Sequence, residues 1–313
     1  MIDHALLWRG GGANIIDPME TITIETKRGD HNMTLYDQVV EATSEIQAHT
    51  TRKPAIALVL GSGLGDLASE ITNATIIPYE HIPHFARSTV VGHAGRLLVG
   101  LLDDVPVVAM QGRFHLYEGY PLQILTLPVR VMYMLGAQTL IVTNAAGGLD
   151  PVYRPGDFML IRDHINMPGL AGTNPLLGPN DERFGPRFPP LAQAYHPELR
   201  ALARAIALTM PEITLHEGVY VMVGGPNYET GAELKFLRMM GSDAVGMSTV
   251  PEVVVARHMG MRVLGLSLIT NAATGEETEE VNHEEVLAAA DAVRPAFSAF
   301  VRGIVRKLAT LNL

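Results

Sequence analysis

The chain has 313 residues and no cysteine, so disulfides, thiolate catalysis and cysteine-ligated zinc are excluded. Its formal net charge of −10 argues against nucleic acid and anionic membranes as partners, and any anionic substrate would need a locally positive pocket. The apolar runs, such as residues 55–60, are far shorter than the ~18 residues of a membrane span, and residues 1–8 lack the pattern of a signal peptide. We therefore expect a cytoplasmic protein.

The first 32 residues differ from the rest of the chain. They contain Gly10-Gly11-Gly12 and show no clear hydrophobic period, whereas periodic sequence begins at Met33. Thr34 and Asp37 have the spacing of a capping box at a helix start. We expect residues 1–32 to form a flexible extension, or to be upstream sequence before a natural start at Met33. No Ser/Gly-rich or Pro-rich linker divides residues 33–313, so we expect one domain there.

Strand and helix patterns alternate along that domain. The expected strands are 55–60, 74–78, 96–102, 105–110, 138–143, 158–161, 215–223 and 262–269. The expected helices are 121–135 with a kink at Pro128, then 197–209, 231–240, 250–259 and 283–308. The alternation predicts an α/β fold with a central mixed, largely parallel β-sheet flanked by helices.

The segment 163–195 breaks this alternation. It is long, polar and rich in proline and glycine, and it carries Phe184. Because long loops within a compact domain usually serve function or contact a partner, we expect a functional or interfacial loop here.

A glycine-rich loop, Gly61-Ser62-Gly63-Leu64-Gly65, follows the first expected strand. Such loops hold anions because their N–H groups can close around oxygens without an intervening Cβ. The dinucleotide fingerprint requires a sixth-position glycine where this chain has Asp66, although Glu80 lies near the place of a ribose-binding acid. No GxxxxGK[ST] motif and no Gly-x-Ser-x-Gly elbow occur in the sequence. A small anion such as inorganic phosphate is therefore the favoured ligand.

Other anion-binding residues lie at the ends of further elements. Arg113 and His115 follow the strand 105–110 and are two residues apart, which places both on one face if the strand continues. Residues 143–148 form another small-residue loop, and Ser248 precedes a helix start. The strand ends of an open α/β sheet gather in one crevice, so these groups predict a single phosphate pocket.

Seven motifs in chain order carry a resemblance to a known family. They are Gly61-Ser62-Gly63-Leu64-Gly65, Val91-Gly92-His93-Ala94-Gly95, Gln111-Gly112-Arg113-Phe114-His115, Thr143-Asn144-Ala145-Ala146-Gly147-Gly148, Gly224-Gly225-Pro226-Asn227-Tyr228-Glu229-Thr230, Val245-Gly246-Met247-Ser248-Thr249-Val250-Pro251-Glu252 and Ile269-Thr270-Asn271. From about residue 33 onward the chain closely resembles the trimeric class of purine nucleoside phosphorylases. The resemblance implies a homotrimer that converts a purine (deoxy)ribonucleoside and phosphate reversibly into free base and (deoxy)ribose 1-phosphate in purine salvage. It implies no cofactor, since phosphate is a co-substrate.

The resemblance also implies roles for individual residues. Phosphate binding falls to Ser62, Arg113, His115, Ala145 and Ser248. Ribose binding falls to His93, Tyr117, Met247 and His283. Base binding falls to Tyr228, Glu229, Val245 and Asn271, and the catalytic set is His115, Asn271 and Glu229. Phe184 resembles the aromatic residue that members of the family insert into a neighbouring subunit's site.

The chemistry of these residue types agrees with that assignment. Glycosidic cleavage builds positive charge on the sugar, which a phosphate dianion below C1′ would stabilise before attacking it. Glu229 accepts hydrogen bonds when ionised and so suits the ring N–H of a 6-oxopurine, and Asn271 can both donate and accept. The related methylthioadenosine phosphorylases carry aspartate at the position of Asn271. We therefore expect a preference for inosine and guanosine.

Two alternatives remain open from sequence alone. One is a 5′-methylthioadenosine phosphorylase, and the other, of a different class, is a nucleotide-binding dehydrogenase or a non-catalytic purine-binding protein. Two departures from the family also stand out: Asn227 replaces a small hydroxyl residue, and the acidic segment 272–281 has no counterpart that we can match. We expect no metal site, because the His81…His84 pair contains Pro83 and lacks a third ligand.

Overall fold

The computed structural model describes residues 33–90, 92–276 and 282–311. The proposed extension 1–32, the motif residue Val91 and part of the acidic segment, residues 277–281, lie outside the described residues. Within the described part of the chain, no helix combines the length and the hydropathy needed to cross a bilayer.

Nine strands form one sheet in the order β2-β3-β4-β1-β5-β8-β7-β6-β9 among the described residues. Their bounds are β1 Ile56–Leu60, β2 Thr72–Pro78, β3 Arg96–Leu102, β4 Val105–Gln111, β5 Thr139–Gly148, β6 Phe158–Asn166, β7 Leu215–Met222, β8 Ala244–Gly246 and β9 Arg262–Ala272. Strands β5 and β9 also pair with each other, so β5, β8, β7, β6 and β9 close into a ring. Parallel and antiparallel pairings both occur, which confirms the predicted mixed sheet.

The parallel pairings bring the predicted site segments together, although residues 143–148, expected to form a loop, are the last residues of β5. In the register of β1 and β4, Leu60 lies beside Gln111, so the loops that begin at Gly61 and Gly112 leave the sheet side by side. Strand β5 pairs in parallel with β1 on one side and with β9 on the other, where Gly147 lies beside Asn271. Sequence segments more than 200 residues apart therefore end at the same edge of the sheet.

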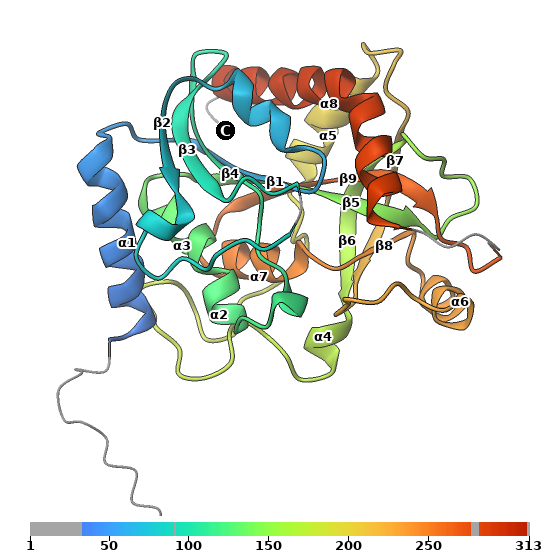
Figure 1. The fold of residues 1–313 in the computed structure, drawn as a ribbon, viewed down its shortest axis with the longest axis horizontal. Coiled ribbons are helices and arrows are strands. Elements are labelled where there is room, and N and C mark those ends of the chain that lie inside the picture. The colour runs from blue at the N-terminus through green and yellow to red at the C-terminus, as the bar shows by residue number, and fades with distance from the viewer. Residues whose placement is uncertain (1–32, 91, 277–281, 312–313) are drawn as a thin grey trace, which may run out of the picture. The chain divides into compact units, whose positions relative to one another are not determined.

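Helices cover both faces of the sheet (Figure 1). Helices α1 Leu35–His49, α2 Leu122–Leu125, α3 Leu127–Met134 and α7 Val250–His258 lie on one side, and α5 Pro197–Ala207 and α8 His283–Leu311 lie on the other. Two short helices, α4 Met167–Leu170 and α6 Gly231–Met239, complete the set, together with the 3₁₀ turns η1 Gly65–Glu70, η2 Tyr79–His81 and η3 Leu116–Glu118.

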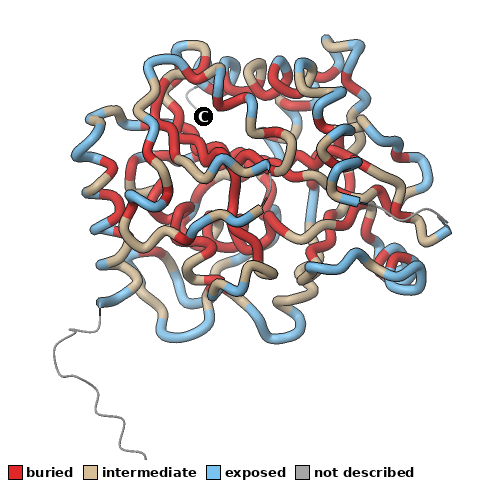
Figure 2. The backbone as a smooth tube through the Cα atoms, viewed as in Figure 1, coloured by how far each residue is buried: buried red, intermediate tan, exposed pale blue. Residues whose placement is uncertain are grey.

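The alternation of side chains along β1 explains the two buried cores. Ala57 and Val59 pack with the core on the side of α1, α3 and α7, whereas Leu58 and Leu60 pack with α5 and α8 on the opposite side. All five residues of β1 are buried, as expected for a strand with helices on both faces (Figure 2).

Most expected elements occur, with several corrected boundaries. The capping box predicted for Thr34 and Asp37 is present at the start of α1. The expected helix 121–135 is instead two helices that meet at Thr126. Pro128 lies in the first turn of α3, where a backbone N–H makes no hydrogen bond within the helix, so the missing N–H of proline is tolerated. The short strand β8 was not expected, and it is held by pairings to β5 and β7 that no local pattern reveals.

The segment 163–195 is only partly a loop. Its first residues extend β6 to Asn166 and form the short helix α4, while the rest contains turns and bends. Residues 163–166 form a strand despite their polar composition, because they pair in parallel with β7.

Candidate active site

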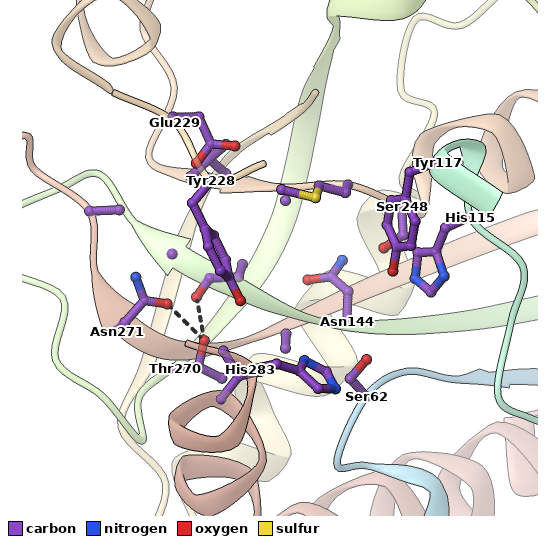
Figure 3. A pocket seen from close by; sticks show the side chains of 18 of the residues that line it. Ser62, His115, Tyr117, Asn144, Tyr228, Glu229, Ser248, Thr270, Asn271 and His283 are labelled. Carbon is purple, nitrogen blue, oxygen red and sulfur yellow. Dashed lines mark hydrogen bonds between the residues drawn. The ribbon is translucent and has the colours of Figure 1, made fainter. Parts of the chain in front are cut away.

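One cavity collects the strand ends described above (Figure 3). It encloses about 750 Å³ of non-protein space, part of it open to solvent. Its lining residues come from the segments after β1, β4, β7 and β8, from β5, β8 and β9, and from the region around the start of α8. They are Ser62, Arg113, His115, Tyr117, Asn144, Ala145, Ala146, Gly147, Tyr228, Glu229, Val245, Gly246, Met247, Ser248, Thr270, Asn271, Ala273, His283 and Val286.

The glycine loop is packed too tightly to accept side chains at two positions. A Cβ on Gly61 would lie 2.7 Å from the backbone oxygen of Thr143. Gly63 has φ +72°, and a Cβ there would lie 2.2 Å from the Cβ of Ala290 in α8. The loop thereby presents Ser62 to the cavity, with its Oγ 3.2 Å from Nε2 of His93. The glycines are required by close approach as well as by backbone conformation.

Arg113 is the buried cation of the cavity, with only 1% of its surface exposed. Its Nη1 donates to Ser248 Oγ at 3.1 Å and to Thr249 Oγ1 at 3.2 Å. Its Nε lies 3.3 Å from Oε1 of Glu252. Neither its Nε nor its Nη2 has a hydrogen-bond partner among the described residues, so both nitrogens have donor capacity left for an acceptor.

His115 is oriented by a carboxylate. Its Nδ1 lies 3.3 Å from Oε1 of Glu118, and its backbone N–H donates to the same oxygen at 2.7 Å. Thr89 donates to the other oxygen of Glu118 through its N–H and its hydroxyl. Burial raises the pKa of Glu118, but hydrogen bonds from His115 and Thr89 outweigh this and lower it to about 2. Glu118 is thus an ionised anchor for the imidazole.

Burial lowers the pKa of His115 below its ordinary value, while the hydrogen bond that His115 donates to Glu118 opposes that shift. The ring stacks between His93 and Tyr117, with centroid separations of 5.3 and 4.8 Å. Burial and the neighbouring His115 and Arg113 lower the pKa of His93 to about 3. Both imidazoles are therefore mostly neutral near pH 7, and a bound anion would favour protonation of His115.

The other wall carries an amide, a carboxylate and an aromatic ring. Asn271 Nδ2 donates to the backbone oxygen of Ala272 at 2.9 Å. Thr270 Oγ1 donates to Asn271 Oδ1 at 3.0 Å (Figure 3). These contacts fix the orientation of the amide. Burial raises the pKa of Glu229 above its ordinary value. Tyr228 lies between this carboxylate and the centre of the cavity (Figure 3).

The cavity therefore has two chemically different walls. Hydroxyl, guanidinium and imidazole donors line one of them, as suits a phosphate group. The aromatic ring, the carboxylate and the oriented amide on the other wall suit a flat heterocycle with polar edges. A molecule that fits this cavity would place a flat ring system against the second wall. The part of it next to the ring would lie within reach of an anion held by the first wall.

A family model of the phosphorylase superfamily matches residues 55–306. The purine nucleoside phosphorylase 1 of Bacillus subtilis is 53% identical over 269 residues, which cover 86% of this chain and 98% of the relative. The chain belongs to the purine nucleoside phosphorylase family. The purine nucleoside phosphorylase of Bos taurus is 52% identical over 269 residues, covering 85% of this chain and 93% of its own.

Solved phosphorylase structures share the fold. A purine nucleoside phosphorylase of Schistosoma mansoni, solved in complex with inosine, has a TM-score of 0.83 at 45% identity. The match covers 87% of this chain and 96% of that structure. The predicted α/β fold and the predicted family are thereby confirmed.

Twelve of the fourteen residues predicted from sequence line the cavity. They are Ser62, Arg113, His115, Tyr117, Ala145, Tyr228, Glu229, Val245, Met247, Ser248, Asn271 and His283. Their individual roles in the phosphorylase reaction stay predictions. His93 does not line the cavity itself but lies behind Ser62 and His115. Its predicted contact with ribose stays a prediction.

The prediction for Phe184 was wrong. Its side chain is 4% exposed and packs in the core against Tyr36 and beneath the guanidinium of Arg130. A residue so buried is unavailable to a neighbouring subunit. Phe188, four positions later, is 86% exposed. The two phenylalanines have similar neighbours in sequence, and only the packing of the segment distinguishes them.

Sequence reasoning missed residues that complete or support the cavity. Asn144 and Thr270 line it, and both stood next to predicted residues within the quoted motifs. Glu118 and Glu252 hold His115 and Arg113 from outside the cavity wall. A carboxylate three residues after His115 was a usable signal for Glu118. Glu252 stood at the end of a quoted motif, but its pairing with Arg113, 139 positions away, had no signal in the sequence.

No three histidine or acidic side chains of the described ranges are grouped as a metal ion would require. His84, one of the pair with superficial metal spacing, is hydrogen-bonded to Glu41 at 2.8 Å.

Proposed function

We propose that this chain catalyses the reversible phosphorolysis of purine (deoxy)ribonucleosides, with a preference for inosine and guanosine. The observation that carries this proposal is that one cavity holds the donor set of Ser62, Arg113 and His115 together with the base-type partners Glu229 and Asn271. The family relationship supports the same reaction, since the relatives are named purine nucleoside phosphorylases.

The reaction needs little covalent chemistry from the protein. The bond between C1′ and the purine nitrogen breaks as an oxygen of phosphate forms a bond to C1′, through a state with positive charge on the sugar. Arg113, Ser62 and Ser248 hold the phosphate dianion in place for attack, and the dianion stabilises the developing charge. The leaving purine carries negative charge, which hydrogen bonding to Asn271 and protonation of the ring relieve.

The base wall favours a 6-oxopurine. Ionised Glu229 accepts from the ring N–H that a 6-oxopurine has and adenine lacks. Thr270 donates to Oδ1 of Asn271. This hydrogen bond fixes where the amide oxygen and the amide nitrogen lie relative to the base. Among the solved relatives, structures hold inosine, guanosine and hypoxanthine, and one holds adenosine. The alternative of a methylthioadenosine phosphorylase is not favoured, because the similar relatives are named purine nucleoside phosphorylases.

The test is inosine cleavage with and without inorganic phosphate. Phosphate-dependent release of hypoxanthine with formation of ribose 1-phosphate is the expected result. Cleavage of methylthioadenosine but not of inosine, or purine binding without any cleavage, would refute the proposal. Ser62→Ala supplies a check on the phosphate wall, since it removes one donor and is expected to raise KM for phosphate by about tenfold.

Three further parts of the proposal concern the state of the enzyme. We propose a homotrimer, in which the exposed Phe188 rather than Phe184 is the aromatic residue available to a neighbouring subunit. Light scattering of the purified chain tests the trimer, and an increased KM for inosine in Phe188→Ala tests the contact.

We propose that no metal or organic cofactor is needed, which predicts full activity after dialysis against a chelator. A cytoplasmic location completes the proposal and is checked by cell fractionation.

A further inference from the structure

A second buried carboxylate stands directly behind Arg113. Glu252 is the third residue of α7 and is 6% exposed, and its Oε1 lies 3.3 Å from Arg113 Nε. It does not line the cavity that holds Ser62 and His115, so it cannot touch a ligand there. Glu252 can therefore influence phosphate through the position of Arg113 or through its own charge, without contact.

Among the nitrogens of the Arg113 side chain, Nη1 alone makes hydrogen bonds to the described residues. Nη1 is held by two hydroxyls, those of Ser248 and Thr249, and Nε lies beside Glu252. Nε and Nη2 are both buried, and neither has a hydrogen-bond partner among the described residues, so the contact of Nε with Glu252 is an ion pair only. An unpaired buried donor of this kind costs about 1–3 kcal/mol, and an incoming phosphate oxygen would remove that cost.

The segment that supplies these partners is itself held in an uncommon conformation. Thr249 has φ +73° and ψ −52°, a region that a β-branched residue rarely adopts. Its hydroxyl accepts from Arg113 and also from Asn144 Nδ2 at 2.9 Å. Thr249 is followed at once by α7, whose first turn carries Glu252. Backbone strain of this kind persists where the surroundings require it, and here it places three side chains around one guanidinium.

A carboxylate partner weakens the attraction of Arg113 for a dianion, so its presence needs another reason. Arginine recognises phosphate by the geometry of its planar fork, and a mobile fork loses that advantage. We propose that Glu252 is a positioning residue that fixes the guanidinium of Arg113 so that Nη2 faces the phosphate. The reach of the side chain at position 252, rather than its charge, is then what phosphate binding depends on. This inference rests on the proposed function only in taking phosphate as the ligand of Arg113.

Two conservative variants separate reach from charge. Glu252→Gln keeps an oxygen at the same distance from Nε and removes the charge. Glu252→Asp keeps the charge and withdraws the carboxylate by about 1.5 Å, the length of one carbon–carbon bond. Both residues are tolerated in a first helical turn, so both variants are expected to fold. Binding of inorganic phosphate is measured directly by calorimetry on the full chain, without nucleoside.

We expect Glu252→Asp to raise Kd for phosphate at least tenfold and Glu252→Gln to change it by less than threefold. In steady-state assays the Asp variant should raise KM for phosphate and leave KM for inosine unchanged. Asp103→Asn is the matched control: it weakens the ion pair with Arg302 of α8, remote from the cavity, and should lower Tm without changing Kd for phosphate.

The opposite order, with the Gln variant weaker than the Asp variant, would mean that charge matters, and the proposal would be overturned. Two variants that lose thermal stability but keep the wild-type Kd would overturn it as well, because Glu252 would then have only a structural role. Calorimetry also keeps this inference apart from the proposed function. A wild-type protein that binds phosphate but cleaves no inosine would refute the function alone, and one that binds no phosphate would refute both.

Discussion

The contact between Gly63 and Ala290 joins the glycine-rich loop 61–65 to α8. Its contribution to stability can be tested by substitution. Gly63→Ala introduces a Cβ that would lie 2.2 Å from the Cβ of Ala290, where normal carbon contacts are about 3.5–4.0 Å. The φ of +72° adds about 1–2 kcal/mol for any L-residue, and overpacking of a buried site adds about 1–3 kcal/mol. We expect Gly63→Ala to destabilise the protein by about 2–5 kcal/mol.

A compensating substitution separates the two terms. Ala290→Gly removes the clashing methyl group, at a cost of about 1 kcal/mol for glycine within a helix. The double variant should therefore be about 1–3 kcal/mol more stable than the sum of the single variants predicts. Gly119→Ala is the matched control, because Gly119 also has positive φ, +84°, but has nothing within 4 Å of its added Cβ. Gly119→Ala should therefore lower the free energy of unfolding only by the cost of an L-residue at positive φ, about 1–2 kcal/mol.

The assay is urea unfolding of the wild type, the three single variants and the double variant, followed by calorimetric phosphate binding. A displaced Ser62 should weaken phosphate binding in Gly63→Ala, with partial recovery in the double variant. The reasoning would be refuted if the single effects simply added to within about 0.5 kcal/mol. It would equally be refuted if Gly63→Ala cost no more than Gly119→Ala.

Three further predictions concern ionisable groups. Glu118→Gln removes the charged anchor that supports protonation of His115, so Kd for phosphate should rise about tenfold by calorimetry; an unchanged Kd would contradict the proposed pairing. Burial raises the pKa of Glu229, so kcat/KM for inosine should begin to fall on acidification at a pH above the ordinary pKa of a glutamate side chain. Glu229→Gln should abolish this acidic limb of the pH profile and lower the affinity for inosine about tenfold. Burial lowers the pKa of His164 to about 4, so its neutral form stabilises the fold above pH ~6.5, and this stability is lost as pH falls toward 4. His164→Gln should therefore reduce the loss of unfolding free energy between pH 7 and pH 5 by about 2 kcal/mol, and equal losses in urea titrations of both proteins would contradict this.

The strand ends were predictable because their chemistry is local. The loop at Gly61 follows a fully apolar run, and Arg113 follows another, so each pattern indicates a buried strand that ends in polar groups. General rules for parallel sheets then bring such ends together. The ring of strands was not predictable in the same way. Strand β8 has only three residues, from Ala244 to Gly246, and it exists because β5 and β7 pair with it.

The sequence by itself determined the family, the sheet-and-helix alternation and most residues that line the cavity, because these depend on residue types at short spacings. Tertiary structure alone decided which phenylalanine of the segment 181–188 is buried, since burial depends on what Tyr36 and Arg130 place around it. It also decided that His93 lies behind Ser62 and that Glu252 meets Arg113. Such contacts join segments far apart in the chain, and the ring packing, hydrogen bonding and ion pairing on which they depend arise only when the fold brings the segments together.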